Sequence, residues 1–255
     1  MFNSNELEAI YVMWLRQMKR FLRSKSRLVV TIVQPLFFLF ILGTGFSRLS
    51  FPGLEGVEFI HFFAPGIVTM SIIFSSMFTG ISVLWDKQFG FLQEVLVAPI
   101  SRLTIVIGRT LGGATISLIQ GLIILIIAIG LGTPISGPIG LIMTIIFMIL
   151  AAFTAVGFGL ILASKMNDFQ SFPLIMNLVI MPLLFLSSAF FPVDTIPALQ
   201  TIAYFNPLFY MVDGIRGSLL GTANVNEPII DFIVVFIICI IMLGIGSYSF
   251  SKSEA

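Results

Sequence analysis

Two charged residues one helical turn apart, Asp213 and Arg216, lie within the otherwise apolar stretch YFNPLFYMVDGIRGS (204–218). At this spacing on a helix, a carboxylate and a guanidinium group can form an ion pair that neutralises both charges. Just upstream, Asn206 is a favoured helix N-cap and Pro207 is a favoured first helical residue. The stretch therefore predicts a sharp turn at Asn206-Pro207, followed by a short helix whose two charges compensate each other.

Other motifs that could carry out chemistry are incomplete. The run GRTLGGAT (108–115) has the two glycines of a phosphate-binding loop, but Ala114 stands where that loop needs lysine. One cysteine, Cys239, and one histidine, His61, provide neither a disulfide framework nor a metal cluster. The sequence contains no recognisable Ser-His-Asp set, His-Glu-x-x-His helix or pair of intramembrane aspartates. We therefore expect no catalytic residues, no cofactor and no metal site.

The composition indicates an integral membrane protein. Of the 255 residues, 58% are hydrophobic and only 10% are charged, whereas a soluble domain carries about 25% charged residues. The net charge of +1 argues against a nucleic-acid partner. Six segments are apolar and long enough to cross a bilayer, which takes roughly 20 helical residues. These expected spans are 28–46, 63–85, 104–131, 139–163, 170–191 and 229–249.

The predicted fold class is an all-α membrane protein with six transmembrane helices in a single domain, 1–255. The parts of this domain are an interfacial helix in 1–27, a six-span bundle in 28–249 and a tail in 250–255. Residues 5–24 have apolar side chains at three- and four-residue spacing and cations on the opposite face. This pattern is typical of a helix that lies in the membrane plane, or of one that packs on a partner protein.

Small residues at four-residue spacing predict where the spans pack most closely. Such residues let two helix backbones approach each other within a bilayer. The candidates are Gly108 with Gly112, and Ala151 with Ala155 and Gly159.

The distribution of lysine and arginine predicts the orientation, because these residues are enriched in cytoplasmic connections. The cations assigned to the cytoplasmic side are Arg16, Lys19, Arg20, Arg23, Lys25, Arg27, Lys87, Arg102 and Lys165. The other side has two cations and more acids, namely Arg48, Arg216, Glu55, Glu58, Asp194, Asp213 and Glu227. Both termini are therefore expected in the cytoplasm. Arg109, within two turns of a cytoplasmic span end, is expected to extend its side chain to the interface.

With both termini on one side, residues 196–220 cannot form a seventh span. We expect two short helices, about 195–204 and 207–219, that form a re-entrant hairpin on the outer face. Such a hairpin must be buried in protein or line a cavity, because exposed backbone ends are costly in lipid. The alternative is an amphipathic loop that lies flat on the outer surface.

The cytoplasmic connection after the second span, DKQFGFLQEVLVAPISR (86–102), predicts another short helix. Asp86 is its expected N-cap and Pro99 its expected end. Its apolar surface favours a covering partner, although it could instead fold back onto the protein's own helix ends.

Two segments, WDKQFGFLQEVLVAPISRLTIVIGR (85–109) and LSSAFFPVDTIPALQTIAYFNPLFYMVDGIRG (186–217), resemble the characteristic segments of type-2 ABC transporter permeases. The similarity is greatest to the membrane subunits of daunorubicin-resistance and nodulation-factor exporters. The span count, the amphipathic amino terminus and QPLFFLFILG in the first span also fit. The sequence departs from the family pattern at Gln88 and Gln93, where acids are common, and at Ser188, where glycine is frequent.

The resemblance implies that 86–99 is a coupling helix that docks on a separately encoded ATPase, which binds ATP and Mg²⁺. The docking residues would be Phe89, Phe91, Leu92, Gln93, Glu94, Val95, Leu96 and Pro99. It also implies that the hairpin closes the outer end of the pathway and that the permease works as a homodimer in the cytoplasmic membrane. The gate residues would be Tyr204, Asn206, Pro207, Tyr210, Asp213 and Arg216.

The expected function is therefore ATP-driven export of a hydrophobic or amphipathic, drug-like or lipid-like substrate. The alternatives are export of a lipid-linked polysaccharide by the same fold and, from another class, an ion-coupled secondary carrier. The carrier is disfavoured because the six expected spans have no charged residue at their middle, and a membrane-bound enzyme is disfavoured because no catalytic residues are visible.

Overall fold

A computed structural model describes residues 4–46, 58–90, 100–166, 168–193, 196–222 and 225–253. Every regular element over these ranges is an α-helix. The helices are α1 (Ser4–Arg23), α2 (Lys25–Gly45), α3 (Phe59–Gln88), α5 (Arg102–Gly130), α6 (Pro138–Lys165), α7 (Ser171–Phe185), α8 (Pro197–Ala203), α9 (Pro207–Leu220) and α10 (Pro228–Ser253). The predicted all-helical fold is confirmed.

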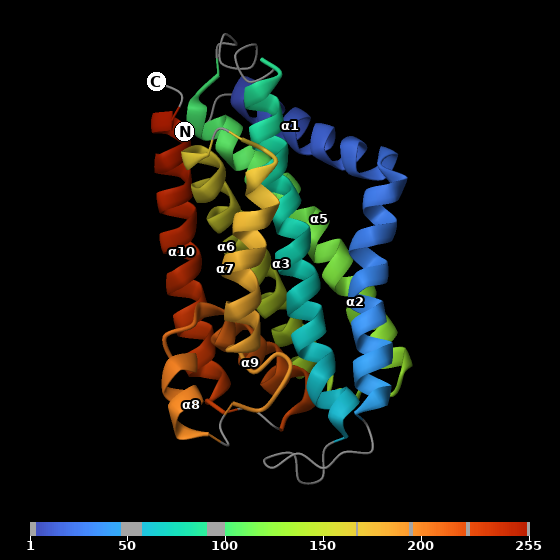
Figure 1. Cartoon of the computed structure of the whole chain (residues 1–255). Coiled ribbons are helices and arrows are strands. Elements are labelled where there is room, and N and C mark those ends of the chain that lie inside the picture. The colour runs from blue at the N-terminus through green and yellow to red at the C-terminus, as the bar shows by residue number, and fades with distance from the viewer. Residues whose placement is uncertain are drawn as a thin grey trace.

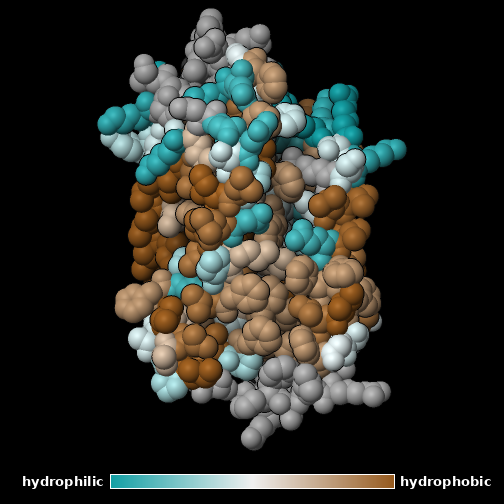
Figure 2. Space-filling view, in the orientation of Figure 1, coloured by the Kyte–Doolittle hydropathy of each residue, from teal (hydrophilic) through white to brown (hydrophobic). Residues whose placement is uncertain are grey.

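The long helices run side by side as a bundle, and two features mark its ends (Figure 1). Both chain termini lie at one end, which we call the terminal end, and α1 lies across that end at a steep angle to the bundle. The short helices α8 and α9 lie at the opposite end, which we call the hairpin end. Hydrophobic side chains form a wide band between the two more hydrophilic ends (Figure 2), as a membrane-spanning protein requires.

Among the described residues, five helices are long and apolar enough to cross a membrane, and the expected fifth span differs from them. The five are α2 from Leu28, α3, α5, α6 and α10 as far as Phe250. In contrast, α7 has 15 residues and is about 22 Å long at 1.5 Å per residue. The prediction of a continuous span over 170–191 is wrong at its carboxyl end, because the chain turns after Phe185 and Ser188 adopts a left-handed backbone with φ of 61°.

The turn after α7 packs directly on α3 at Gly66. A Cβ atom at Gly66 would lie 2.2 Å from the carbonyl oxygen of Ala189. This is far inside van der Waals contact, so glycine is required for the turn to approach α3. The shortened α7 and the turn are therefore fixed to the bundle at the hairpin end.

Two glycines of α5 allow α1 to pack closely on it. Their spacing predicted a close helix contact, but one between spans and not with the interfacial helix. A Cβ atom at Gly108 would lie 2.7 Å from Met13 Cβ, and one at Gly112 would lie 3.0 Å from Gln17. On α6, Ala151 is fully buried. Gly157, which the spacing did not single out, allows α6 to approach the backbone of α10 at Met242.

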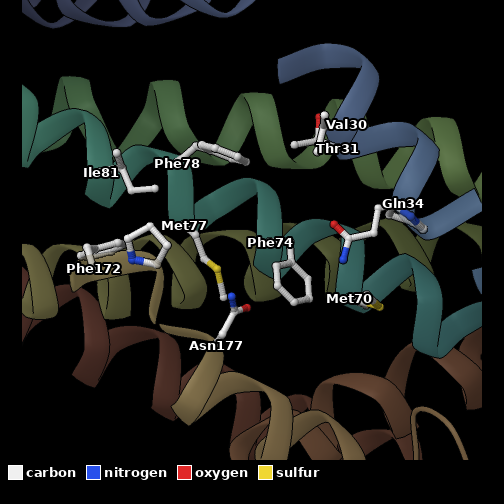
Figure 3. Close-up of a pocket in the computed structure, with 12 residues that line it drawn as sticks. Val30, Thr31, Gln34, Met70, Phe74, Met77, Phe78, Ile81, Phe172 and Asn177 are labelled. Atoms are coloured by element: carbon white, nitrogen blue, oxygen red, sulfur yellow. The ribbon is translucent and has the colours of Figure 1, made fainter. Parts of the chain in front are cut away.

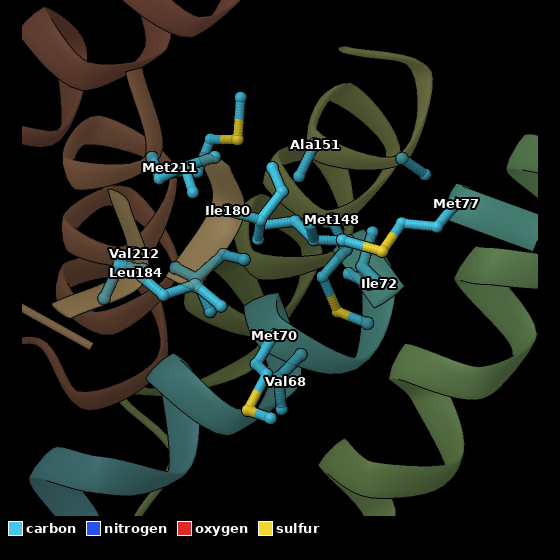
Figure 4. Packing of buried hydrophobic residues seen from close by; sticks show 14 of the residues in the cluster. Val68, Met70, Ile72, Met77, Met148, Ala151, Ile180, Leu184, Met211 and Val212 are labelled. Carbon is cyan, nitrogen blue, oxygen red and sulfur yellow. The ribbon is translucent and has the colours of Figure 1, made fainter. Parts of the chain in front are cut away.

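The core is formed mainly by α3, α5, α6, α7 and α9 and contains several methionines (Figure 4). Figure 4 shows Met70 and Met77 of α3, Met148 of α6 and Met211 of α9 in the same cluster. Methionine fills irregular spaces because its side chain is unbranched and flexible. The presence of α9 in this cluster shows that it is an internal element of the bundle.

Candidate functional site

Asn206 begins α9 and ties the hairpin to α7. Its side-chain oxygen accepts a hydrogen bond from the Leu208 N–H over 3.0 Å, and Pro207 is the first helical residue. The cap and the turn predicted from the sequence are both confirmed. The side-chain amide of Asn206 also donates to the Leu183 carbonyl of α7 over 2.6 Å, a contact that the local sequence does not reveal.

Two tyrosines close the turn between α8 and α9. The hydroxyl group of Tyr210 donates to the backbone carbonyl of Tyr204 over 2.9 Å. Both rings also lie edge-on to Phe209, with centroids 5.6 Å from it for Tyr204 and 5.3 Å for Tyr210. The expected hairpin residues are therefore in contact with one another.

Arg216 is fully buried and joins three parts of the chain at the hairpin end. Its Nε donates to the Phe62 carbonyl of α3 over 3.2 Å, and its Nη1 donates to the Ser188 hydroxyl over 3.2 Å. Its Nη2 donates to the Ser188 carbonyl, and the guanidinium group lies 3.8 Å from the centre of the Phe62 ring. The left-handed turn at Ser188 thus presents both of its oxygens to one arginine.

Asp213 faces Arg216 but receives its hydrogen bonds from the backbone beyond α9. The Val225 N–H donates to its carboxylate over 2.9 Å, and the Asn226 N–H donates over 2.8 Å. The distance from Arg216 Nη1 to Asp213 Oδ1 is 4.0 Å, at the outer limit of an ion pair. The predicted pairing is present in this weak form, and both side chains are fully shielded, which the assignment of these residues to the outer side did not reveal.

A second buried set of charges lies where α1 crosses the terminal end. Arg16 of α1 makes two hydrogen bonds to Asp86 of α3, over 2.9 and 3.2 Å, and Arg20 adds one over 3.0 Å. From α5, Arg109 Nη2 lies 2.9 Å from Asp86 Oδ2. We call these four residues the terminal cluster, and one carboxylate in it serves three cations from two helices.

The terminal cluster corrects two predictions. Asp86 does not begin a coupling helix, because α3 continues without a break to Gln88 and the aspartate points into the protein. Arg109 does not extend to the interface, because it is only 1% exposed, is held by Asp86 and lies 5.7 Å from the centre of the Phe250 ring. Sequence reasoning missed that these two residues of different helices meet.

A groove of about 210 Å³ opens on the side of the bundle between α2, α3 and α7 (Figure 3). Its walls are mostly apolar, but the amides of Gln34 from α2 and Asn177 from α7 lie on either side of Phe74. Both amide residues are exposed. On this face, hydrophilic patches interrupt the hydrophobic band (Figure 2). An exposed amide within a bilayer is costly without a polar partner, so this groove is the candidate pathway surface.

Comparison with known protein families identifies the family of this chain. The family model for the ABC-2 type transporter matches residues 8–220, from the first helix to the end of α9. The chain belongs to the ABC-2 type transporter family. It is the membrane permease subunit, and its family membership implies a partner ATPase subunit.

Three relatives show how far the similarity extends. The inner membrane transport permease YadH of Escherichia coli K12 is 25% identical, and the match covers 92% of both chains. The transport permease ycf38 of Cyanophora paradoxa is 29% identical over 82% of this chain and 73% of its own. Nodulation protein J of Rhizobium leguminosarum bv. viciae is 29% identical over 76% of this chain and 75% of its own. The resemblance inferred from the sequence is therefore confirmed.

In this permease, the predicted ATPase-docking residues are only partly described. Phe89 follows the last turn of α3, is 73% exposed, and lies edge-on to Trp85 with the ring centroids 6.1 Å apart. Gly90 follows with φ of 76°, a left-handed conformation that glycine adopts without strain. The remaining residues of the predicted coupling helix, which are Phe91, Leu92, Gln93, Glu94, Val95, Leu96 and Pro99, lie outside the described residues.

Proposed function

We propose that the permease is one half of a homodimeric ATP-driven exporter that moves a hydrophobic or amphipathic, drug-like or lipid-like substrate across the cytoplasmic membrane. The observation that carries this proposal is the groove between α2, α3 and α7. Its Gln34 and Asn177 side chains are exposed within an otherwise hydrophobic band. A second copy placed against this groove would cover the amides and enclose a pathway with apolar walls and a few polar groups, which suits an amphipathic cargo.

The positive charges of α1 support placing the terminal end in the cytoplasm. Arg16, Lys19, Arg20 and Arg23 line one open surface of α1, and cations near span ends favour the cytoplasmic side. The amphipathic helix would then lie at the inner membrane surface with its cations at the headgroups. YadH is named as an inner membrane permease, which supports the cytoplasmic membrane as the location.

Energy would enter through the segment that follows α3. Phe89 is a large aromatic side chain exposed at the terminal end, where a cytoplasmic ATPase would reach it. We propose that Phe89 and the apolar residues after it, above all Leu92 and Leu96, dock on the ATPase. Because Asp86 lies one turn before Phe89 and binds both α1 and α5, a displacement of this segment would pull on three helices at once.

The hairpin end would be the outer gate. The helices α8 and α9 would enter and leave the membrane from the outer face, and α9 is nearly all buried. Its carboxyl end is held by Ser136, whose N–H donates to the Leu219 carbonyl over 2.7 Å. These contacts support a re-entrant hairpin over a flat surface loop, because they place α9 inside the bundle.

Export of a lipid-linked polysaccharide by the same fold is the second candidate. The observation that favours it is the aromatic part of the groove, where Phe74, Phe78 and Phe172 lie together, because aromatic faces suit sugar rings. The two cargo classes differ in size and in polarity, so a transport assay separates them.

The test is ATP-driven transport by the permease reconstituted with its ATPase in vesicles, with labelled amphiphiles and lipid-linked oligosaccharides as cargo. Asn177→Leu should lower transport of the amphiphile several-fold while leaving assembly with the ATPase intact. The matched control is Leu178→Val on the same helix, since Leu178 is 76% exposed and does not line the groove. Oligosaccharide transport without amphiphile transport would select the second candidate, and equal transport by Asn177→Leu and wild type would contradict the pathway.

A further inference from the structure

A second buried carboxyl group lies beside Asp213. Asp231, in the first turn of α10, is fully shielded, as is Asp213. The backbone N–H of Asn226 donates to Asp213 Oδ2 over 2.8 Å, and its side-chain amide donates to Asp231 Oδ1 over 3.1 Å. The backbone and the side chain of one residue therefore bind one carboxyl group each, which makes the two carboxyl groups neighbours in a buried site.

The donors around this pair leave one oxygen without a hydrogen bond. Both oxygens of Asp213 accept backbone N–H groups from Val225 and Asn226. Asp231 Oδ2 is buried and receives no hydrogen bond from a donor within the described ranges. A buried carboxylate oxygen in this state is costly. A proton on it would remove the charge and would supply a donor to Asp213.

The charged groups around the pair also favour a proton on one of the two carboxyl groups. The ionisable side chains on the elements packed around the pair include Arg216 and Tyr210 on α9, His61 on α3 with its neighbour Glu58, and Glu227 before α10. Helix α7 contains no ionisable side chain, and the only one on α6, Lys165, is at that helix's other end. His61 lies 3.9 Å from Glu58, and Glu227 is exposed. Among the described residues, Arg216 is thus the one buried cation beside this pair, and it lies 4.0 Å from Asp213. Two neighbouring buried carboxyl groups with a single nearby cation cannot both stay ionised.

We propose that Asp213 and Asp231 form a proton-binding site that holds one shared proton while the hairpin end is closed. Helix α9 supplies one carboxyl group and α10 supplies the other. Separating these helices would break the carboxyl–carboxylate hydrogen bond and admit water. A hydrated aspartic acid ionises below neutral pH, so the proton would pass to water. Opening is therefore coupled to proton release, and alkaline pH outside favours the open state. This last step rests on the outer-gate role proposed above, whereas the proton site does not.

Infrared spectroscopy of the permease in nanodiscs at neutral pH tests for the proton directly. The wild type should show the C=O band of a protonated carboxyl group, and Asp231→Asn should lose it. The asparagine keeps the shape and offers an N–H donor to Asp213, so the fold should persist. Glu227→Gln, which removes an exposed acid from the same connection, should leave the band in place. Absence of the band in wild type, or its persistence in Asp231→Asn, would overturn the site.

Thermal unfolding at different pH values gives a second measurement. The folded pair keeps its proton at a pH at which the unfolded chain has lost it, so the folded state binds more protons. The free energy of unfolding must then fall as pH rises towards the point at which the folded pair ionises. Asp231→Asn should lose this slope, and an unchanged slope would again overturn the proton site. The proton site and its coupling to the gate can fail separately. If the infrared band and the pH slope are as expected but transport depends on outer pH in the same way in wild type and in Asp231→Asn, the proton site stands and only the coupling to the gate is wrong.

Discussion

The permease buries charge at both ends of its bundle, and the two ends use opposite designs. In the terminal cluster, one carboxylate, Asp86, serves three arginines. At the hairpin end, one guanidinium, Arg216, lies 4.0 Å from Asp213, and Asn226 binds both Asp213 and the neighbouring Asp231. We call Arg216, Asp213, Asp231 and Ser188 the hairpin cluster. One cluster is therefore centred on an anion and has a surplus of positive charge, whereas the other is centred on a cation and has a surplus of carboxyl groups.

Access to water separates the two clusters further. The side chains of Arg16 and Arg20 are 28% and 40% exposed, so the surplus positive charge can remain hydrated. Asp213 and Arg216 have no exposed side-chain surface, so a surplus charge there must be neutralised inside the protein. The terminal cluster is thus suited to hold α1 on the bundle while its outer cations contact headgroups. The hairpin cluster is suited to a gate whose opening changes its charge.

Removing the single cation of the hairpin cluster should have the largest effect. Arg216→Met leaves buried carboxyl groups without a counter-charge, and breaking a buried pair in this way costs about 3–5 kcal/mol. Thermal unfolding of the purified permease measures the loss. Asp213→Asn added to Arg216→Met should restore part of the stability, because it removes one stranded charge and keeps an acceptor for Val225 and Asn226.

Arg109→Met at the other end is the matched comparison. Arg109 is also buried, but Asp86 would keep Arg16 and Arg20 after its loss. We expect a smaller cost, about 1–3 kcal/mol, because the buried carboxylate loses one of its three charged partners and keeps two. If Arg109→Met is less stable than Arg216→Met, the proposed difference is wrong: losing one of the three arginines of the terminal cluster would then cost more than losing the single arginine of the hairpin cluster.

The second prediction removes the centre of the terminal cluster. Asp86→Asn should lower stability by about 3 kcal/mol, at the low end of the cost of breaking a buried ion pair. Arg109 would remain buried without its anion, whereas the partly exposed Arg16 and Arg20 can turn to water. The substitution should also loosen α1, where the Trp14 Nε1 donates to the Thr115 hydroxyl over 3.2 Å. In a Trp85→Phe background, Trp14 fluorescence reports this directly. Unchanged Trp14 emission in Asp86→Asn would show that glycine-mediated packing alone holds α1 in place.

Features that depend on residues adjacent in the sequence were predicted. The two buried charge clusters were not predicted, because each is formed by residues that lie far apart in the sequence. Asn206-Pro207 located the start of α9, because a cap and its helix are neighbours in sequence. The bond from Arg216 to the Phe62 carbonyl joins residues 154 positions apart, and no periodicity encodes it. Apolar composition made 170–191 resemble one span, although the helix ends at Phe185 and Ser188 then adopts a left-handed backbone. The sequence showed serine at this position, where glycine is frequent in the family. The positive φ explains why glycine suits the position.

The substitution with the smallest expected effect removes Arg20, a partly hydrated cation, in contrast to the buried Arg216. Arg20 donates to Asp86 over 3.0 Å but its side chain is 40% exposed, and exposed ion pairs contribute about 0.2–1 kcal/mol. Arg20→Met should therefore lower stability by less than about 1 kcal/mol, and added salt should shrink even that difference. Arg23→Met is the control, since it removes the same charge from an exposed position of α1. If Arg20→Met costs as much as Arg216→Met and salt leaves the loss unchanged, the terminal cluster is as closed to water as the hairpin cluster. The contrast between the two ends would then lie in the sign of their charge alone.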